Sequence, residues 1–383
     1  MNNPDQTPRD AMEVIAEGTA LTMRTLLKDG RKGHVGLMNP WTGRYSLTEQ
    51  YQSMDVGYLL GRLWLLHLYT QRSEFRDWAM TLLEPLVPAL TDGELTGRTA
   101  GVDIYYGLCW GADITGSEDL RNSAIKATDN LIAGLWQPQA GDGLFYSGAS
   151  RNHTNIDSLL ALLPLPWCAK YDSKYMAYFT RHADTIMGIG LVRPDGSTFQ
   201  AALFDENHRL KYLSTTQGWK TDSTWARGQG WAMHNFVSAY EATGRSDHLD
   251  VAVSVCDWWV EHVPQDYVPH YDFDDPERFS KPKDSCAAAL AVLALVRLAR
   301  ARPELAPRYQ PIITSTIQEL FNNYLTVGGL LLHGTWGNAV GRWGRSLRWP
   351  QEDVMPYGNY YFVEALYRSL TDDWDLFRLG PHS

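Results

Sequence analysis

Apolar and polar residues follow one another along this chain in a pattern that recurs six times. In each unit, a helical segment that is apolar nearly all round is followed, after a short turn, by a helical segment with one charged face. A helix that is apolar on every face is buried, whereas an amphipathic helix lies at the surface. The apolar segments begin near residues 55, 103, 156, 229, 285 and 360. The pattern therefore predicts an all-α fold, an (α/α)6 six-hairpin barrel of inner and outer helices.

A long loop precedes each predicted inner helix, and in such a barrel these loops gather at one end. Their ranges are 30–54, 91–102, 137–155, 191–228, 263–284 and 327–358. Loops of this length within a compact domain usually carry function. Small β-hairpins are expected only near 192–205 and 329–335. No linker and no low-complexity segment interrupts the pattern, so we predict a single domain spanning 1–383.

The stretch 193–231 concentrates chemistry-bearing residues in one of these loops. Its first part, RPDGSTFQAALFD, combines a Pro-Asp-Gly turn with alternating bulky residues and predicts a short β-hairpin. Its second part, TTQGWKTDSTWARGQGW, predicts a polar, aromatic loop that leads into a buried helix beginning near Trp225. Any one of these tryptophans could equally be an ordinary core residue. The cluster as a whole favours a site that offers a stacking surface, a fixed cation and amide hydrogen bonds.

Composition and charge narrow the class of partner. The chain has 383 residues with 15 Trp and 20 Tyr, which are the usual stacking faces for sugar rings. Its formal net charge is −10 and no basic run stands out, so nucleic acid is not an expected partner. An anionic substrate would need a local pocket of Arg, Lys or backbone amides.

The cysteines and the chain ends bear on the compartment. Cys109, Cys168, Cys256 and Cys286 form no CxxC pair, so we predict free, buried thiols in a reducing, cytoplasmic compartment. The sequence shows no secretory signal and no apolar run long enough to span a membrane. It also lacks an HExxH motif, a Walker loop and a Rossmann fingerprint, so we predict neither a metal nor a cofactor.

Two carboxylates stand at corresponding places in the pattern. Asp103 in AGVDIYYG and Asp157 in HTNIDSLLAL both lie at the start of an inner helix. A carboxylate pair in an aromatic cavity suits acid/base chemistry on a sugar. Alternatively, both are helix-start residues that interact well with the helix dipole. Position alone does not choose among the acids at this end, which include Asp55, Asp205, Asp222 and Asp284.

Several sequence blocks, spread from about residue 55 to 370, resemble the unsaturated glucuronyl hydrolases. They include DSTWARGQGWAMHNF, NIDSLLALLPLPWCAKY, KDSCAAALAVLAL, GLLLHGT and YGNYYFVEAL. The blocks WARGQGW and DSLLALLPL are the most specific. The resemblance implies an α/α six-hairpin barrel and a glycosidase that removes a 4,5-unsaturated uronic acid from the non-reducing end of an oligosaccharide. A small oligosaccharide or sugar acid is therefore the expected partner, bound by a monomer or a homodimer.

The resemblance also implies a mechanism and a set of site residues. In that family a carboxylic acid protonates C4 of the enol ether, water adds to the resulting cation, and the hemiketal collapses and expels the remaining sugar. By similarity, Asp157 is the acid/base residue and Asp103 is the second carboxylate, which orients and tunes it. The positions that match the family's substrate pocket are Trp136, Gln217, Arg227 and Trp231.

Three positions depart from the family pattern. Val102 replaces the His that commonly precedes the first Asp, and Gln200 replaces the His of the hairpin. The Trp that commonly precedes the first inner helix is replaced near Met54. We therefore expect weak activity on the usual glycosaminoglycan disaccharides and include Val102 and Gln200 among the substrate-contact positions. Two alternatives remain: another hydration, elimination or hydrolysis on this scaffold in a biosynthetic pathway, or a non-catalytic carbohydrate-binding relative.

Overall fold

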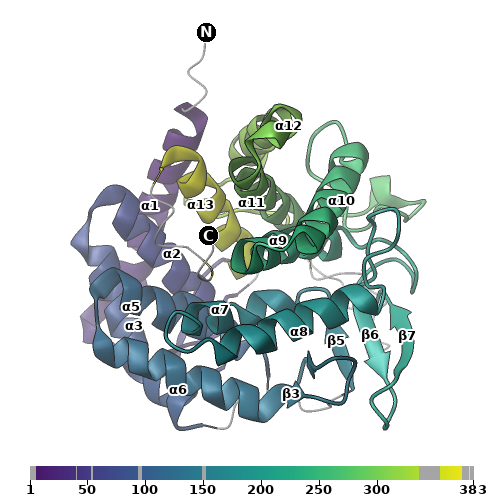
Figure 1. The fold of residues 1–383 in the computed structure, drawn as a ribbon. Coiled ribbons are helices and arrows are strands. Elements are labelled where there is room, and N and C mark those ends of the chain that lie inside the picture. The colour runs from purple at the N-terminus through teal and green to yellow at the C-terminus, as the bar shows by residue number, and fades with distance from the viewer. Residues whose placement is uncertain are drawn as a thin grey trace.

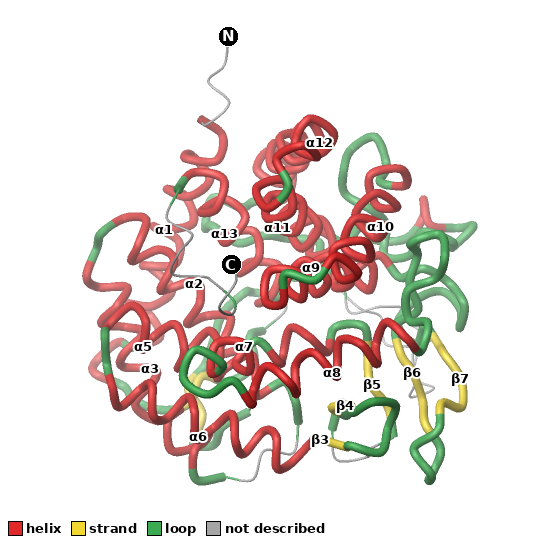
Figure 2. The backbone as a smooth tube through the Cα atoms, in the orientation of Figure 1, coloured by secondary structure: helices red, strands yellow, loops and turns green. Residues whose placement is uncertain are grey.

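The structure is a computed structural model that describes residues 6–39, 41–52, 55–93, 97–148, 152–335, 354–372 and 379. Within these ranges, helical hairpins follow one another around a ring (Figures 1 and 2). The inner layer consists of α2 (Asp55–Thr70), α4 (Ala100–Asp103) with η2 (Ile104–Cys109) and α5 (Trp110–Thr115), η3 (Ser158–Leu162) with α7 (Pro164–Cys168), α9 (Ala226–Thr243), α11 (Ser285–Ala301) and α13 (Pro356–Leu370). The outer layer consists of α1 (Gln6–Leu26), α3 (Ser73–Thr91), α6 (Glu118–Leu135), α8 (Lys174–Gly188), α10 (Ser246–His262) and α12 (Ala306–Glu319). The predicted six-hairpin α/α barrel is thereby confirmed.

Short helical turns connect or extend these helices. They are η1 (Lys28–Gly30), η4 (Arg278–Ser280), η5 (Pro303–Leu305) and η6 (Leu320–Tyr324). One of the inner segments is unusual, because η2 widens to π-helical turns directly after Asp103. Such wide turns occur frequently at functional sites.

The inner helices are buried on nearly every face, as their composition predicts. In α11 every residue from Ser285 to Ala299 is buried, and in α9 burial runs without a break from Ala226 to Ala239. The outer helix α6 buries one face only, through Leu120, Ala124, Ala127, Thr128, Leu131 and Leu135. Burial of apolar surface contributes about 25 cal/mol per Å² and is the main favourable term in folding. The two layers thus follow directly from the two hydrophobic patterns.

The two ends of the chain meet and close the ring. The last inner helix, α13, packs against both α2 and α11, and α1 packs against α12 and α13 (Figure 1). A buried guanidinium reinforces this closure, because Arg62 of α2 donates through Nη2 to the carbonyl oxygen of Gly329 at 2.8 Å. Aromatic rings fill the space where these helices meet. Tyr106 and Tyr360 have centroids 4.4 Å apart, and Tyr58 lies 5.7 Å from Tyr360 and 5.8 Å from Tyr361.

Strands are short and lie in the loops between hairpins. β1 (His34–Val35) pairs with β2 (Leu47–Thr48), and β3 (Trp136–Gln137) pairs with β4 (Leu144–Phe145). A third antiparallel sheet has the order β5 (His153–Asn155), β6 (Ala201–Phe204) and β7 (Leu210–Ser214). The sheets β1–β2 and β3–β4 were not predicted. Near 329–335, where a hairpin was predicted, Leu325 and Leu331 form a single bridge.

The hairpin predicted at 192–205 needs a correction. The Pro-Asp-Gly turn is present, with Val192 and Thr198 bridged across it and Gly196 at a φ of 90°. However, β6 does not pair back across this turn. It pairs instead with β7 and with β5, in a register that sets Asn155 opposite Ala201. Alternating hydrophobicity predicts a strand but does not identify its partner, and here the partner is about 50 residues away in the chain.

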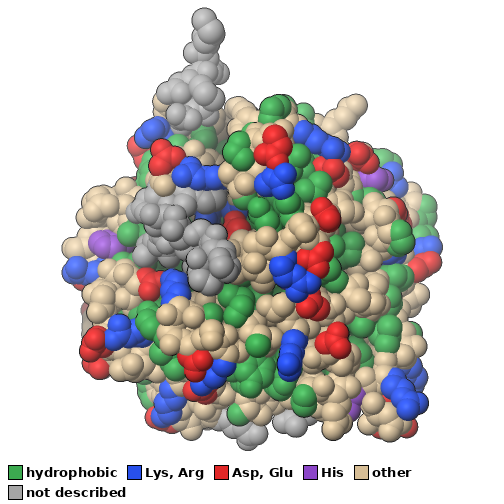
Figure 3. Space-filling model, in the orientation of Figure 1, with side chains coloured by type: hydrophobic (Ala, Val, Ile, Leu, Met, Phe, Trp, Pro, Cys, Tyr) green, Lys and Arg blue, Asp and Glu red, His purple; other side chains and the backbone are tan. Residues whose placement is uncertain are grey.

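Charged side chains of both signs lie side by side on the face of the molecule in Figure 3. Ion pairs join neighbouring outer elements, as between Arg24 and Glu74 at 3.1 Å and between Lys126 and Asp92 at 2.9 Å. These pairs are largely exposed, so each contributes little to stability. Among the described residues, no helix is both long and apolar enough to cross a lipid bilayer.

A close approach of two inner segments at Gly101 gives a first testable prediction. A Cβ atom added to Gly101 would lie 1.7 Å from the carbonyl oxygen of Ala161, so α4 and η3 can pack together only without a side chain there. Gly101→Ala is expected to lower the free energy of unfolding by about 1–3 kcal/mol, the usual cost of overpacking. Urea denaturation of Gly101→Ala and of Gly188→Ala, whose added Cβ meets nothing within 4 Å, is the measurement. Equal stabilities of the two variants would contradict this contact.

Candidate active site

Asp103 is fully buried at the end of α4 and is held from two sides. The Tyr51 hydroxyl donates to its Oδ2 atom, and the Gly57 backbone N–H of α2 donates to Oδ1 at 2.8 Å. Gly57 permits this approach, because a Cβ atom there would lie 2.5 Å from Asp103 Oδ1. Burial raises the pKa of Asp103 to about 7 against the two hydrogen bonds, and the neighbouring Asp55 charge acts in the same direction as burial. Asp103 can therefore hold a proton near neutral pH.

Asp55, the third helix-start carboxylate, is buried at the first turn of α2. The Met38 backbone N–H donates to its Oδ2 atom at 2.7 Å. Burial raises the pKa of Asp55 to about 6, and the Met38 hydrogen bond opposes that rise. This contact ties the loop 30–54 to α2, which supports a structural role for Asp55.

Asp157 lies immediately before η3 and differs from Asp103 in exposure and partner. Its side chain is 34% exposed, and Oδ1 accepts a hydrogen bond from Arg98 Nη2 at 2.9 Å. The Arg98 side chain is only 4% exposed. Because α4 and η3 pack directly together at Gly101, the two predicted catalytic carboxylates lie on adjoining elements.

Buried polar groups hold both neighbours of Asp157 in place. The Ile156 N–H donates to the Gln200 carbonyl at 2.7 Å, and the Asn235 side-chain amide donates to the Ile156 carbonyl at 2.7 Å. On the other side, Ser158 Oγ lies 2.7 Å from His182 Nε2. The Phe145 N–H donates to His182 Nδ1, so Nε2 carries the proton and donates to Ser158. Asp157 therefore projects from a backbone segment with little freedom to move.

The His182 ring remains neutral in this setting. Burial lowers the pKa of His182 to about 3, and the nearby Arg98 charge adds to the effect. A neutral imidazole that accepts at one nitrogen and donates at the other is a rigid spacer. His182 thus supports Asp157 through Ser158 without adding a charge beside it.

Gln200, predicted as a substrate contact, is buried, and both the oxygen and the nitrogen of its amide bond to the protein. Its Oε1 atom accepts from the Thr216 backbone N–H, the Thr216 hydroxyl and the Gln217 backbone N–H at 2.8–2.9 Å. Its Nε2 group donates to Gln217 Oε1. Gln200 therefore joins β6 to the turn at 216–217 and orients the half-buried Gln217.

These bonds make Gln200 a position where substitution should disturb structure first. Gln200→Leu leaves the partly buried backbone N–H groups of Thr216 and Gln217 without their acceptor, so we expect the free energy of unfolding to fall by about 1–3 kcal/mol. Denaturant unfolding, with Gln139→Leu at an exposed loop position as the matched control, measures the effect. A Gln200→Leu protein as stable as that control would show that this network is not formed in solution.

Arg227 and Trp231 lie one helical turn apart in α9, and both are buried. Arg227 Nη1 donates to Asp284 Oδ2 at 2.9 Å and also to the Thr335 carbonyl oxygen. Its guanidinium lies 4.7 Å from the Trp225 ring centroid and 5.1 Å from that of Tyr357. Arg227 is thus the cation of a buried ion pair, enclosed by aromatic rings.

The remaining predicted site residues are placed differently. The Trp231 ring is 5% exposed and packs edge-on against Tyr361 at 5.6 Å. Val102 is 2% exposed and belongs to the core. Trp136 is half-buried and packs against Phe145 and Tyr178, each at a centroid distance of 5.0 Å, beside the outer helix α8. Met54, named for the missing Trp, lies outside the described residues.

Sequence reasoning missed the residues that hold the carboxylates. Arg98 and Tyr51 lie in the long loops that were expected to carry function, but neither belongs to a motif. His182 and Asn235 lie in helices with no local sign of a role. Their importance depends on partners that are 24 to 79 residues away in the chain. Among the described residues, no group of three or more His, Cys, Asp or Glu side chains is arranged to hold a metal ion.

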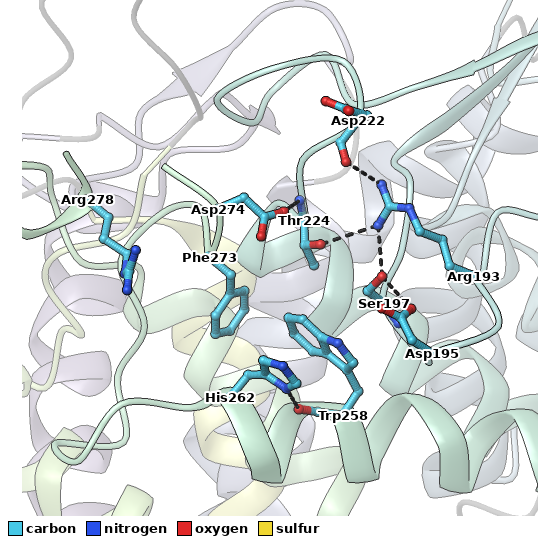
Figure 4. A pocket seen from close by; sticks show the side chains of 10 residues that line it. All are labelled: Arg193, Asp195, Ser197, Asp222, Thr224, Trp258, His262, Phe273, Asp274 and Arg278. Carbon is cyan, nitrogen blue, oxygen red and sulfur yellow. Dashed lines mark hydrogen bonds between the residues drawn. The ribbon is translucent and has the colours of Figure 1, made fainter. Parts of the chain in front are cut away.

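A separate cavity of about 380 Å³ lies between the loop 193–224 and the segment 258–278 (Figure 4). Arg193 lines this cavity, but its guanidinium is hydrogen-bonded to other residues of the protein. Its Nη1 group donates to Ser197 Oγ and to the Thr198 carbonyl oxygen, and its Nη2 group donates to the Asp222 carbonyl oxygen. On its floor the His262 ring is stacked on Trp258 at 4.0 Å (Figure 4). Neither Asp103 nor Asp157 lines this cavity, so we treat it as part of the scaffold that carries the loop before α9.

Known proteins show the same architecture over nearly the whole chain. No family model matches. An unsaturated glucuronyl hydrolase from a Bacillus species is 28% identical over 374 residues, which cover 93% of this chain and 96% of the relative. The solved structure of an unsaturated glucuronyl hydrolase from Bacillus sp. GL1 matches with a TM-score of 0.82 at 26% identity and covers 94% of this chain and 96% of its own. The chain is thus similar over nearly its whole length to unsaturated glucuronyl hydrolases, which supports the resemblance seen in its sequence blocks.

Relatives within this family differ in the substrate that their names specify. An unsaturated chondroitin disaccharide hydrolase from Streptococcus pneumoniae is 26% identical to this chain over 342 residues, covering 84% of the chain and 82% of the relative. These similarities indicate a glycosidase, and the barrel described above is the fold of the solved unsaturated glucuronyl hydrolases.

Proposed function

We propose that this enzyme removes a 4,5-unsaturated uronic acid from the non-reducing end of a small oligosaccharide or glycoconjugate by hydrating the enol ether. The observation that carries the proposal is the carboxylate pair on α4 and η3 in a chain similar to this family. One member, Asp103, is buried and takes a proton readily, and the other, Asp157, is half-exposed on a fixed backbone. A solvent-accessible acid beside a buried one is an arrangement suited to proton transfer.

In the proposed reaction Asp157 is the acid and base. Its carboxyl proton passes to C4 of the substrate, and the electron pair of the double bond forms the new C4–H bond. The positive charge that results is shared by C5 and the ring oxygen. Water then bonds to C5 through its oxygen and returns a proton to Asp157. The C5–ring oxygen bond then breaks as the proton of the C5 hydroxyl moves to the ring oxygen, which leaves a ketone at C5 and a hemiacetal at C1. The hemiacetal collapses to an aldehyde at C1: the bond from C1 to the oxygen of the remaining sugar breaks, and that oxygen takes up the hemiacetal hydroxyl proton as the sugar leaves.

Asp103 is proposed to affect this reaction through its charge, from a buried position on the adjoining helix α4. Because its pKa lies at about 7, it is neutral over much of the range below neutrality and adds no second negative charge near Asp157 there. Tyr51, whose hydroxyl bonds to Asp103 and whose side chain is half-buried, connects the buried carboxyl to the loop layer. Gln217 and Trp231 are proposed to line the substrate pocket. For Trp136 the same role rests on the family resemblance alone.

The substrate is proposed to differ from the usual glycosaminoglycan disaccharides. Where the family pattern carries two imidazoles, Val102 is apolar and buried, and the Gln200 amide is used within the protein. A substrate hydroxyl that needs a donor at either position would lose roughly 1–3 kcal/mol. This difference also supports the second candidate, altered chemistry on another enol ether in a biosynthetic pathway. The four buried thiols support a reducing, cytoplasmic setting.

The test is a panel of unsaturated disaccharides that differ in linkage and sulfation, followed by loss of the ultraviolet absorbance of the conjugated double bond. Loss of absorbance with release of the second sugar supports the proposed hydrolysis. Protection from thermal unfolding without any loss of absorbance would instead show a carbohydrate-binding relative. Efficient turnover of chondroitin or hyaluronan disaccharides would overturn the proposed substrate difference.

A further inference from the structure

The guanidinium of Arg98 is buried but only partly used by the protein. One N–H group, at Nη2, bonds to Asp157 Oδ1 at 2.9 Å. Its Nε group is buried and has no hydrogen-bond partner among the described residues. An unpaired buried N–H on a charged group costs free energy. A planar guanidinium offers donors that match a carboxylate in two-point geometry, so a bound carboxylate could satisfy it better than Asp157 alone does.

The backbone around Arg98 fixes the guanidinium relative to Asp157. Gly97 is bridged to Gly148, and the Gly101 N–H donates to the Arg98 carbonyl at 2.8 Å, so the turn leads directly into α4. Asp157, by contrast, has a side chain that is 34% exposed. A ligand can therefore reach the Asp157 end of this ion pair, while the arginine end remains fixed.

Arg227 is less suited to hold a ligand carboxylate. Its Nη1 group is committed to Asp284 and Thr335, and its side chain is 2% exposed between two aromatic rings. Taking Asp284 away from Arg227 would leave a buried charge unpaired, which typically costs about 3–5 kcal/mol. Taking Asp157 away from Arg98 leaves a half-exposed carboxylate that water can solvate or protonate.

We propose that Arg98 changes partner during the reaction, from Asp157 in the free enzyme to the carboxylate of the substrate in the complex, and thereby frees Asp157 to hold the proton that it delivers. This inference rests on the proposed function. While Arg98 pairs with Asp157, its Nη2 group donates to Oδ1 of the carboxyl that must carry the proton for C4. A substrate carboxylate removes the cationic partner and adds a like charge, and both changes favour protonation of Asp157 by a proton from solvent.

The other titratable groups around Asp157 would not promote its protonation when a substrate binds. Arg227 and Tyr58 both interact electrostatically with Asp157, but Arg227 stays paired with Asp284 and Tyr58 is buried and neutral. His182 stands behind Ser158 as a neutral ring. Asp103 on the adjoining α4 can itself take up a proton near neutral pH. A measurement of proton uptake must therefore separate the contribution of Asp103 from that of Asp157. Of the charged groups named here, all within the described part of the chain, Arg98 is thus the one near Asp157 whose partner a ligand can take.

Calorimetry of ligand binding tests the proton uptake. The ligand is a saturated uronic acid disaccharide, which carries the carboxylate but has no double bond to react. Titrations at pH 7 in phosphate and in Tris, which differ in ionisation enthalpy, give the number of protons taken up. We expect uptake of up to one proton by the wild type and a clearly smaller uptake by Asp157→Asn, which retains Asp103. Equal uptake by the two proteins, or none by a wild type that hydrolyses unsaturated uronides, would overturn the proposal.

Steady-state kinetics test the carboxylate contact itself. Arg98→Gln should raise KM roughly 10- to 100-fold, the worth of a hydrogen bond to a charged group, and Arg98→Lys should raise it less. The matched control is Arg297→Gln, which removes another buried arginine, paired with Glu241 away from the site. A purely structural role for Arg98 would lower stability in both variants without this rise in KM, and so would overturn the inference. Absence of turnover of any unsaturated uronide by the wild type would instead overturn the proposed function.

Discussion

Asp157→Asn is expected to lower kcat by about two to four orders of magnitude, the usual contribution of a positioned acid/base group, while the protein stays folded. The amide cannot deliver a proton to C4 or take one from water. The Asp157 side chain is half-exposed and its neighbours Ile156 and Ser158 are held through other groups, so the backbone should keep its shape. The rate of absorbance loss at saturating substrate measures kcat, and circular dichroism confirms the fold.

Asp184→Asn is a closely matched control for this experiment. Asp184 lies on the outer helix α8, with a side chain 32% exposed and an ion pair to Arg245 at 2.8 Å. Asp157 has nearly the same exposure and the same kind of partner at 2.9 Å. Both substitutions remove a half-exposed carboxylate that pairs with an arginine, although Arg98 is 4% exposed and Arg245 is 38% exposed. Only Asp157→Asn should lose turnover. Near-normal kcat in a folded Asp157→Asn protein would remove Asp157 from the mechanism.

Asp103→Asn is expected to make the protein more stable than the wild type above pH 7, by about 3–5 kcal/mol, because burial raises the pKa of the Asp103 carboxyl to about 7 in the folded state. Because the pKa of Asp103 is higher in the folded state than in the unfolded state, the folded protein binds more protons between about pH 4 and pH 7. The free energy of unfolding therefore falls as the pH rises through this window, and the penalty is complete above it. An asparagine does not ionise and avoids the penalty.

Urea denaturation of both proteins at pH 5, 6, 7 and 8 measures this difference. The advantage of Asp103→Asn should grow with pH and level off above pH 7. Asp55, whose pKa is also raised by burial, is present in both proteins, so its contribution largely cancels in the difference. The same variant is expected to turn over substrate poorly, because the second carboxylate is lost. A stability difference that does not change with pH would show that Asp103 is not buried as described.

The hydrophobic pattern was sufficient to predict the barrel, because burial of a helix is written in its own residues. The all-apolar run of α11 requires an inner position, and the one-sided pattern of α6 requires an outer one. The same local logic placed the start of α9 at Trp225. It did not identify the partners of β6, because the neighbouring strand β7 lies beyond the predicted hairpin and pairing with β5 depends on register between segments about 50 residues apart in the chain.

The sequence also indicated which two carboxylates to examine, through their position at helix starts and through the family resemblance. It did not determine how they differ. Asp103 is buried because Tyr51 and Gly57 close over it, and Asp157 is half-exposed beside Arg98, which is 59 residues earlier. Likewise, Arg227 in WARGQGW was expected to serve a ligand, and only the tertiary structure pairs it with Asp284. Desolvation and charge pairing act between residues that the fold brings together, so a carboxylate's environment depends on packing that no local pattern contains.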